Sequence, residues 1–139
     1  MSEHGTLHLR TVAGAGLRFE AVFSTGTVVM DSGAAPAGPN PVQTLLASLA
    51  ACEAMDVIAV LRKQRQSISA YEVLMSGERA AVHPRRYTAI ELVHRVTGQG
   101  VRRSAVEEAL RLSVEKYCSV YHSIRPDIVI TNRIEILEG

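Results

Sequence analysis

The feature that most limits the fold of this chain is a long apolar segment that runs from Asn40 to Gln66. Asn40 can cap a helix and Pro41 suits the first helical position, so the segment predicts a helix over residues 41–66. At 1.5 Å per residue this helix would be roughly 40 Å long. Its large apolar residues surround the axis instead of forming one stripe: Leu45, Leu46, Leu49, Met55, Val57, Ile58, Val60 and Leu61. A helix that is apolar all round is a buried helix.

The chain is short for a helix of this kind. With 139 residues it is expected to form a single domain, residues 1–139, with one core. One small domain can hardly cover so long a helix on every side. We therefore expect a homodimer in which the partner chain supplies the missing cover.

Segments with alternating apolar residues predict strands on both sides of this helix. Before it they cover residues 6–12, 16–23 and 27–30, and after it residues 70–80, 85–98 and 127–139. In the fifth of these, Ile90, Leu92, His94 and Val96 share one face. A second helix is predicted over residues 104–118, where Ser104 and Glu107 have the spacing of a capping box. Together these elements predict an α+β fold.

Charge and composition argue against several classes of function. Lys and Arg number 15 and Asp and Glu 14, so the net charge of +1 favours neither nucleic acid nor a membrane surface as a partner. No stretch approaches an uncharged spanning segment of about 20 residues, and the first ten residues lack the apolar core of a secretory signal. We therefore expect a cytoplasmic protein whose cysteines rest reduced. The glycines of residues 33–39 have neither dinucleotide-binding nor P-loop spacing.

The chain holds two cysteines, Cys52 inside the predicted long helix and Cys118 at the end of the second helix. Two buried structural thiols are one interpretation, because a free cysteine packs as a small apolar residue. Their positions on different elements also permit a pair that forms and breaks. A reactive thiol needs a nearby positive charge, whereas the neighbours of Cys52 are Glu53 and, one turn later, Asp56. An arginine from elsewhere in the fold is therefore required if Cys52 is reactive.

The same cysteines leave a metal site open as an alternative. Cys118 and His122 are four residues apart, and Cys52 and His94 could join them. The chain lacks the C-x2-C spacing of a structural zinc site, however, and a surface position would also explain His122.

Three segments of the chain resemble a known family. They are GPNPVQTLLASLAACEAMDVIAVLRKQRQ, HPRRYTAIELVHRVTG and VEEALRLSVEKYCSVYHSI. The first is similar to the central helix of the OsmC/Ohr family, the osmotically induced and organic hydroperoxide resistance proteins. The other two are similar to its later strand and its second cysteine motif. The resemblance covers nearly the whole chain, and the C-x-x-M-D-V motif that begins at Cys52 is similar to the OsmC-like branch.

This resemblance implies a fold, a partner and an activity. The fold is an intertwined homodimer with long buried central helices packed against antiparallel β-sheets. The activity is a thiol-dependent reduction of organic hydroperoxides, in which Cys52 attacks the peroxide and the sulfenic acid that forms condenses with Cys118 to a disulfide. A dithiol of the lipoyl type then reduces the disulfide, and neither a metal nor an organic cofactor takes part.

The family also implies an arginine and a glutamate beside the first cysteine. Arg18 is the candidate arginine, with Arg10 as the second choice. The family glutamate at the start of the central helix is missing, since Val42 takes its place and Gln43 follows. Gln43 could form a hydrogen bond with an arginine but cannot pair with its charge.

An apolar pocket mouth beside the first cysteine would favour alkyl hydroperoxides as substrates. Its candidate lining residues are Leu49, Met55 and Tyr121, all of which also suit an ordinary core.

The missing carboxylate keeps a second hypothesis open. Glu53 and Asp56 are candidate substitutes for it. Without a substitute, the chain could be a non-enzymatic dimeric module that binds a small molecule or senses oxidants.

Overall fold

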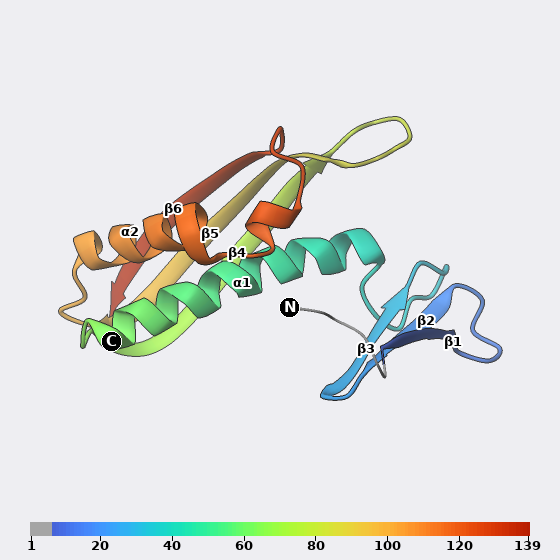
Figure 1. The fold of residues 1–139 in the computed structure, drawn as a ribbon, viewed down its shortest axis with the longest axis horizontal. Coiled ribbons are helices and arrows are strands. Elements are labelled where there is room, and N and C mark those ends of the chain that lie inside the picture. Colours follow the sequence, from blue (N-terminus) through green and yellow to red (C-terminus); the bar gives the residue numbers. More distant parts are fainter. Residues whose placement is uncertain (1–6) are drawn as a thin grey trace. The chain divides into compact units, whose positions relative to one another are not determined.

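The computed structural model describes residues 7–139. Contacts within the chain define two compact units, with their boundary in the sequence between Leu45 and Leu46. The first unit is built on one sheet and the second on a sheet with helices (Figure 1). Thr6, with which the first predicted strand begins, lies outside the described residues.

Three strands form the sheet of the first unit. They are β1 (His8–Thr11), β2 (Arg18–Phe23) and β3 (Gly26–Asp31). Neighbouring strands are antiparallel, and their order is β1-β2-β3 (Figure 1). They confirm the three strands predicted ahead of the long helix.

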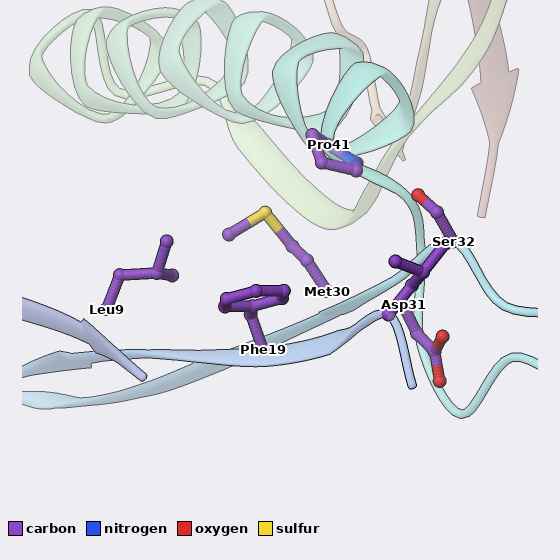
Figure 2. A pocket seen from close by; sticks show the side chains of 7 residues that line it. Leu9, Phe19, Met30, Asp31, Ser32 and Pro41 are labelled. Carbon is purple, nitrogen blue, oxygen red and sulfur yellow. The ribbon is translucent and has the colours of Figure 1, made fainter. Parts of the chain in front are cut away.

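The two faces of this sheet differ in polarity, as the alternation along a strand predicts. One face borders a cavity of about 230 Å³, which is lined by Leu9, Leu17, Phe19, Met30, Asp31, Ser32 and Pro41. Figure 2 shows the side chains of Leu9, Phe19 and Met30 on one side of the strands, whereas the carboxylate of Asp31 points away from them. Ion pairs join neighbouring strands elsewhere in the sheet, between Arg10 and Glu20 at 3.0 Å and between Arg18 and Asp31 at 2.8 Å.

Helix α1 (Pro41–Lys63) begins where the sequence predicts. Asn40 caps it, because its Oδ1 accepts a hydrogen bond from the Gln43 N–H at 2.8 Å while Gln43 Oε1 accepts one from the Asn40 N–H at 2.9 Å. This reciprocal pair is a capping box, which satisfies two backbone donors at the helix start. The helix ends before the predicted residue 66, since Arg65 adopts a left-handed conformation (φ 56°) that stops helices.

Within this single chain, α1 buries one stripe rather than its whole surface. The buried residues are Leu46, Leu49, Ala50, Glu53, Val57 and Leu61, which recur at the three- and four-residue spacing of one helix face. Leu45 and Met55 remain 43% and 68% exposed. One chain therefore does not bury α1 on every side, although the sequence predicts such burial for this helix. A partner chain that covers its other face stays a prediction.

By length and composition, α1 is apolar enough to cross a membrane. The helix carries Glu53 and Asp56, so it is not the uncharged spanning segment that the sequence excludes. A buried core helix passes the same test, and Val57 and Leu61 of α1 belong to the core of the second unit.

Three strands form the sheet of the second unit, in the order β4 (Ser67–Arg79), β5 (Tyr87–Gln99) and β6 (Val129–Glu138). β4 and β5 pair antiparallel, whereas β5 and β6 pair parallel. The parallel pair departs from the expected antiparallel sheets. It follows from the connection, because the chain passes through a helix between β5 and β6, and a helical crossover returns a strand in the same direction.

That helix, α2 (Arg103–Leu112), continues directly into the π-helical turn Ser113–Tyr117. The predicted helix over residues 104–118 is confirmed in extent, but its capping box is wrong. Arg102 occupies the cap position in an extended conformation, and no side chain in the described part of the chain caps the helix. Ser104 therefore already lies inside the first turn. A short 3-10 turn, Tyr121–Ser123, follows before β6.

The core of the second unit lies between its helices and one face of its sheet (Figure 1). It consists of Val57, Leu61, Val96, Ala105, Val106, Ala109 and Leu110.

The predicted inner face of β5 is confirmed, because Ile90, Leu92, His94 and Val96 are all buried. Ion pairs cross the sheet at other positions, where Arg95 of β5 binds Glu72 of β4 and Glu135 of β6. This alternation places His94 among apolar neighbours.

Candidate active site

Cys52 and Cys118 lie side by side in the second unit. Their Sγ atoms and a carboxylate oxygen of Asp56 are all within 4.8 Å of one another. Both cysteines are free thiols, and Cys52 is half-buried whereas Cys118 is completely buried. The two cysteines of the chain therefore meet in space although they lie far apart in sequence.

Two local features of the fold bring these groups together. Cys52 and Asp56 are one turn apart on α1, so their side chains lie on the same side of the helix. The π-helical turn after α2 closes with a hydrogen bond from the Cys118 N–H to the Ser113 carbonyl at 2.8 Å. Ser113 also donates its hydroxyl to Asp56 Oδ2 at 2.9 Å, which ties this turn to α1. Single π-turns are frequent at functional sites.

Burial raises the pKa of the Cys118 thiol to about 12. The backbone N–H of Tyr121 opposes this rise, since it donates to Cys118 Sγ at 3.3 Å. The neighbouring Cys52 thiol and the charge of Glu53 raise the pKa of Cys118 further. Cys118 therefore rests as a neutral thiol at physiological pH and becomes a nucleophile only when its proton is removed.

Glu53, which follows Cys52 in the chain, is a buried acid inside the core. It is 0% exposed, and neither of its carboxylate oxygens has a hydrogen-bond partner among the described residues. Its Oε1 lies 3.7 Å from Nε2 of the buried His94.

His94 has a polar partner at each ring nitrogen, because its Nδ1 is 2.6 Å from the Tyr71 hydroxyl and its Nε2 is 3.1 Å from Asn132 Oδ1. Burial, and after it the charge of Glu53, raises the pKa of the Tyr71 hydroxyl.

This polar network behind the cysteines was not predicted from the sequence. The alternation of β5 places His94 on the inner face but does not reveal its partners. The one available signal was a histidine among Ile90, Leu92 and Val96, because a buried imidazole needs hydrogen-bond partners.

The expected pocket residues lie in different surroundings. Tyr121 is beside Cys118 through its backbone N–H, and its ring meets that of His122 edge-on at 5.3 Å between centroids. Leu49 is a core residue with 1% exposure, whereas Met55 is 68% exposed in the single chain. Gln43 belongs to the first unit, where its side chain takes part in the capping box of α1. Their role in a substrate pocket stays a prediction.

Both candidate arginines belong to the first unit. Arg18 Nε donates to Asp31 Oδ2 at 2.8 Å, and Asp31 also accepts hydrogen bonds from the N–H groups of Gly33 and Ala37. The Ala37 N–H, the Arg18 guanidinium and the Gly33 N–H together lower the pKa of Asp31 to about 2. Arg10 pairs with a glutamate of the neighbouring strand. Contact between either arginine and Cys52 stays a prediction.

The metal-ligand set suggested by the sequence is not assembled. Among residues 7–139, the compact group of ligand atoms contains Cys52, Cys118 and Asp56 but neither His94 nor His122. His122 instead makes a 2.8 Å hydrogen bond through its Nε2 to a backbone carbonyl, and His94 is held inside the core.

The structure is thus an α+β protein with two neighbouring thiols. One thiol lies on a long helix, and the other lies at the end of a following helix. Comparison with protein families shows which class of protein has this arrangement. The family model described as OsmC-like protein matches residues 32–133, a range that includes both cysteines. The chain therefore belongs to the OsmC family.

Individual relatives support this assignment. The chain is 35% identical over 123 residues to protein YhfA of Escherichia coli K12, which covers 88% of this chain and 92% of that protein. A crystal structure of a hypothetical protein from Aquifex aeolicus VF5 is 28% identical, with a TM-score of 0.84 over 98% of this chain and 99% of the other. An organic hydroperoxide resistance protein OsmC from Legionella pneumophila is 16% identical, with a TM-score of 0.65 over 96% and 99%. This last likeness concerns the fold alone.

Proposed function

We propose that this protein is a cysteine-based peroxidase that reduces organic hydroperoxides. The observation that carries the proposal is the proximity of a half-buried Cys52 to a buried Cys118, with Sγ atoms no more than 4.8 Å apart. A disulfide bond is about 2 Å long, so the two sulfur atoms must approach each other by at most about 2.8 Å to form one. Membership of the OsmC family supports the proposal, and the solved Legionella relative is named as an organic hydroperoxide resistance protein.

In the proposed reaction Cys52 is the attacking thiol, because it is the more accessible of the two. Its thiolate attacks the terminal oxygen of ROOH, the O–O bond breaks, and the alkoxide takes up a proton and leaves as an alcohol. Cys52 is then a sulfenic acid. Cys118 loses its proton and attacks the Cys52 sulfur, the S–O bond breaks, and the hydroxide leaves as water. The product is the Cys52–Cys118 disulfide.

An external dithiol would complete the cycle. Its first thiolate attacks the disulfide and forms a mixed disulfide, and its second thiol resolves that intermediate and releases reduced protein. A lipoyl-type dithiol is the proposed reductant, and the cytoplasm is the proposed location, where thiols are kept reduced.

The remaining assignments of the proposal come from the family resemblance. Arg18 would stabilise the Cys52 thiolate and hold the peroxide. The proposed pocket residues are Gln43, Leu49, Met55 and Tyr121, and the proposed assembly is a homodimer.

The test is a reaction of the reduced protein with a slight excess of cumene hydroperoxide, followed by a count of free thiols and by intact mass. We expect both thiols to disappear with a mass decrease of about 2 Da, the loss of two hydrogens on disulfide formation. Cys52→Ser should abolish the reaction. Cys118→Ser should leave a sulfenic acid at Cys52 that a sulfenate-specific reagent traps. Thiols that remain intact in the unsubstituted protein would refute the peroxidase.

A second candidate is a non-enzymatic module that binds a small molecule or senses oxidants. The observation that favours it is the pair of acids at the cysteines, Glu53 in the core and Asp56 beside both sulfurs, because negative charge disfavours a thiolate. Slow oxidation by the peroxide, without catalytic turnover when a dithiol is supplied, would distinguish this module from the enzyme.

A further inference from the structure

We propose that Cys52, Asp56 and Cys118 form a zinc-binding site. Their two sulfur atoms and one carboxylate oxygen lie within 4.8 Å of one another. Zn–S bonds of about 2.3 Å and Zn–O bonds of about 2.1 Å place the ligand atoms of a tetrahedral ion roughly 3.6 to 3.8 Å apart. Movements of roughly 1 Å or less would close the three atoms around one ion.

The chemistry of the three donors selects zinc among common cations. Thiolates are soft ligands that magnesium and calcium do not use, whereas zinc accepts sulfur and carboxylate oxygen together. Three protein ligands leave a fourth position of the tetrahedron for water or another small donor.

The charges around the site favour a cation. Among the residues that the structure describes, no lysine or arginine forms an ion pair with Asp56 or Glu53. Glu53 is completely buried, has no hydrogen-bond partner among residues 7–139, and lies 3.7 Å from His94 Nε2 through its Oε1. Its negative charge reaches Cys118. A bound divalent cation would offset these charges and would also stabilise both thiolates.

The carboxylate of Asp56 is already held in position. Ser113 donates its hydroxyl to Asp56 Oδ2 at 2.9 Å. Second-shell hydrogen bonds of this type orient the carboxylates that bind metals. Asp56 also borders a cavity of about 390 Å³, whose lining residues are Asp56, Ala59, Val60, Lys63, Gln64, Leu112 and Tyr117.

Zinc binding would displace the protons of both thiols and form two Zn–S bonds, with release of two protons per ion. A sulfur bound to zinc no longer offers a free thiolate, so the bound ion should protect both cysteines from peroxide. The zinc site stands on its own geometry, and only this protection rests on the proposed function.

The first experiment titrates the reduced full-length chain with zinc chloride against a chromophoric chelator, and then with cobalt chloride in its absence. We expect one zinc per chain and a cobalt complex with sulfur-to-metal charge-transfer bands and intense tetrahedral d–d bands. Cys52→Ser and Cys118→Ser should each weaken zinc binding by about 100-fold or more and reduce the charge-transfer bands. Asp56→Asn should weaken binding by about 10-fold or more while it keeps the charge-transfer bands.

Two further variants make the test specific. Ser113→Ala should weaken zinc binding by about 10-fold, because it removes only the hydrogen bond that orients Asp56. Asp127→Asn, which removes an exposed carboxylate on a loop, should bind zinc as the unsubstituted chain does. Absence of stoichiometric zinc, or affinity that is equal in the Asp56→Asn and unsubstituted chains, would overturn the site.

The outcome is distinguishable from that of the peroxidase test. A chain that binds zinc through these residues but ignores cumene hydroperoxide supports the zinc site and refutes the peroxidase. A chain that forms the disulfide but binds no zinc supports the peroxidase and refutes the zinc site. If both properties hold, the zinc-loaded chain should lose its thiols to peroxide more slowly than the metal-free chain, because the bound sulfurs are not free thiolates.

Discussion

His94 illustrates, at the scale of one residue, how a polar side chain is accommodated in an apolar face. In the neutral ring of His94, the acceptor Asn132 Oδ1 requires the hydrogen on Nε2, which leaves Nδ1 to accept the hydroxyl hydrogen of Tyr71. Both ring nitrogens are thus satisfied in a residue with no exposure. Removal of one partner leaves a buried acceptor unpaired, which costs more than the hydrogen bond itself contributes.

We therefore expect Tyr71→Phe to lower the free energy of unfolding by about 1–3 kcal/mol, because it leaves His94 Nδ1 without a donor. Urea denaturation at pH 7 measures the change. Tyr117→Phe is the matched control, since Tyr117 is half exposed and its substitution should change stability by less than about 0.5 kcal/mol. Equal effects in the two variants would show that the hydrogen bond to His94 contributes nothing.

The two cysteines should differ in reactivity. Cys52 is half-buried, whereas Cys118 is completely buried and has a pKa raised to about 12. At pH 8 and with limiting iodoacetamide, we expect Cys52 to be alkylated first. Cys118, measured in Cys52→Ser, should react at least about 100-fold more slowly than a small free thiol, because so little of it is thiolate. Peptide mass analysis over time gives both rates, and similar rates for the two cysteines would contradict the difference in environment.

At the scale of elements, the two helices begin in different ways. The start of α1 is stabilised by the Asn40–Gln43 capping box, whereas α2 starts at Arg103 with no side-chain cap from residues 7–139. We expect Asn40→Ala to lower the free energy of unfolding by about 1 kcal/mol. Ser104→Ala, at the position where the sequence predicts a cap, should change it by less than about 0.5 kcal/mol. Thermal or urea unfolding of both variants measures this, and a larger effect at Ser104 would place the cap there after all.

The first sheet should lose stability in acid through Asp31. The folded-state pKa of Asp31 is lowered to about 2 from an ordinary value of 3.8, so the folded protein binds this proton less tightly than the unfolded chain. Its contribution to stability is therefore fully present above about pH 4 and is lost as the pH falls towards 2. Asp31→Asn should be less stable than the unsubstituted chain at pH 7, and the difference should narrow between pH 4 and pH 2. Unfolding midpoints across this range measure the difference, and a constant gap would contradict the assignment.

For the whole molecule, the uncovered face of α1 predicts self-association. Met55 is 68% exposed on a helix whose opposite stripe is buried, and exposed large apolar groups mark interfaces. We propose a homodimer and expect Met55→Glu to shift it towards the monomer by about 10-fold or more in dissociation constant, because a charge would be buried at the contact. Ser104→Glu, which adds a charge to an exposed position on α2, is the control. Sedimentation equilibrium measures both variants, and a monomeric unsubstituted chain would refute the dimer.

The order of the elements follows from local signals along the chain. The strands, the two helices and the start of α1 were all predicted, since alternation, helical spacing and capping residues are properties of neighbouring amino acids. The inner face of β5 was predicted for the same reason, and the cysteine motifs were enough to indicate the family. The false capping box at Ser104 shows the limit of such signals, because a two-residue pattern can occur inside a helix as easily as at its start.

The chain by itself thus determined its elements and its family, and it singled out the two cysteines as the candidate reactive groups. Only the tertiary structure decided which residues meet. The parallel pairing of β5 with β6, the π-turn that delivers Cys118 to Cys52, the contact of Ser113 with Asp56 and the burial of Glu53 beside His94 all join residues far apart in sequence. Such contacts arise when helices pack on a sheet. The surroundings of each side chain then depend on residues of other elements, and the amino acids next to it in the sequence do not reveal which residues those are.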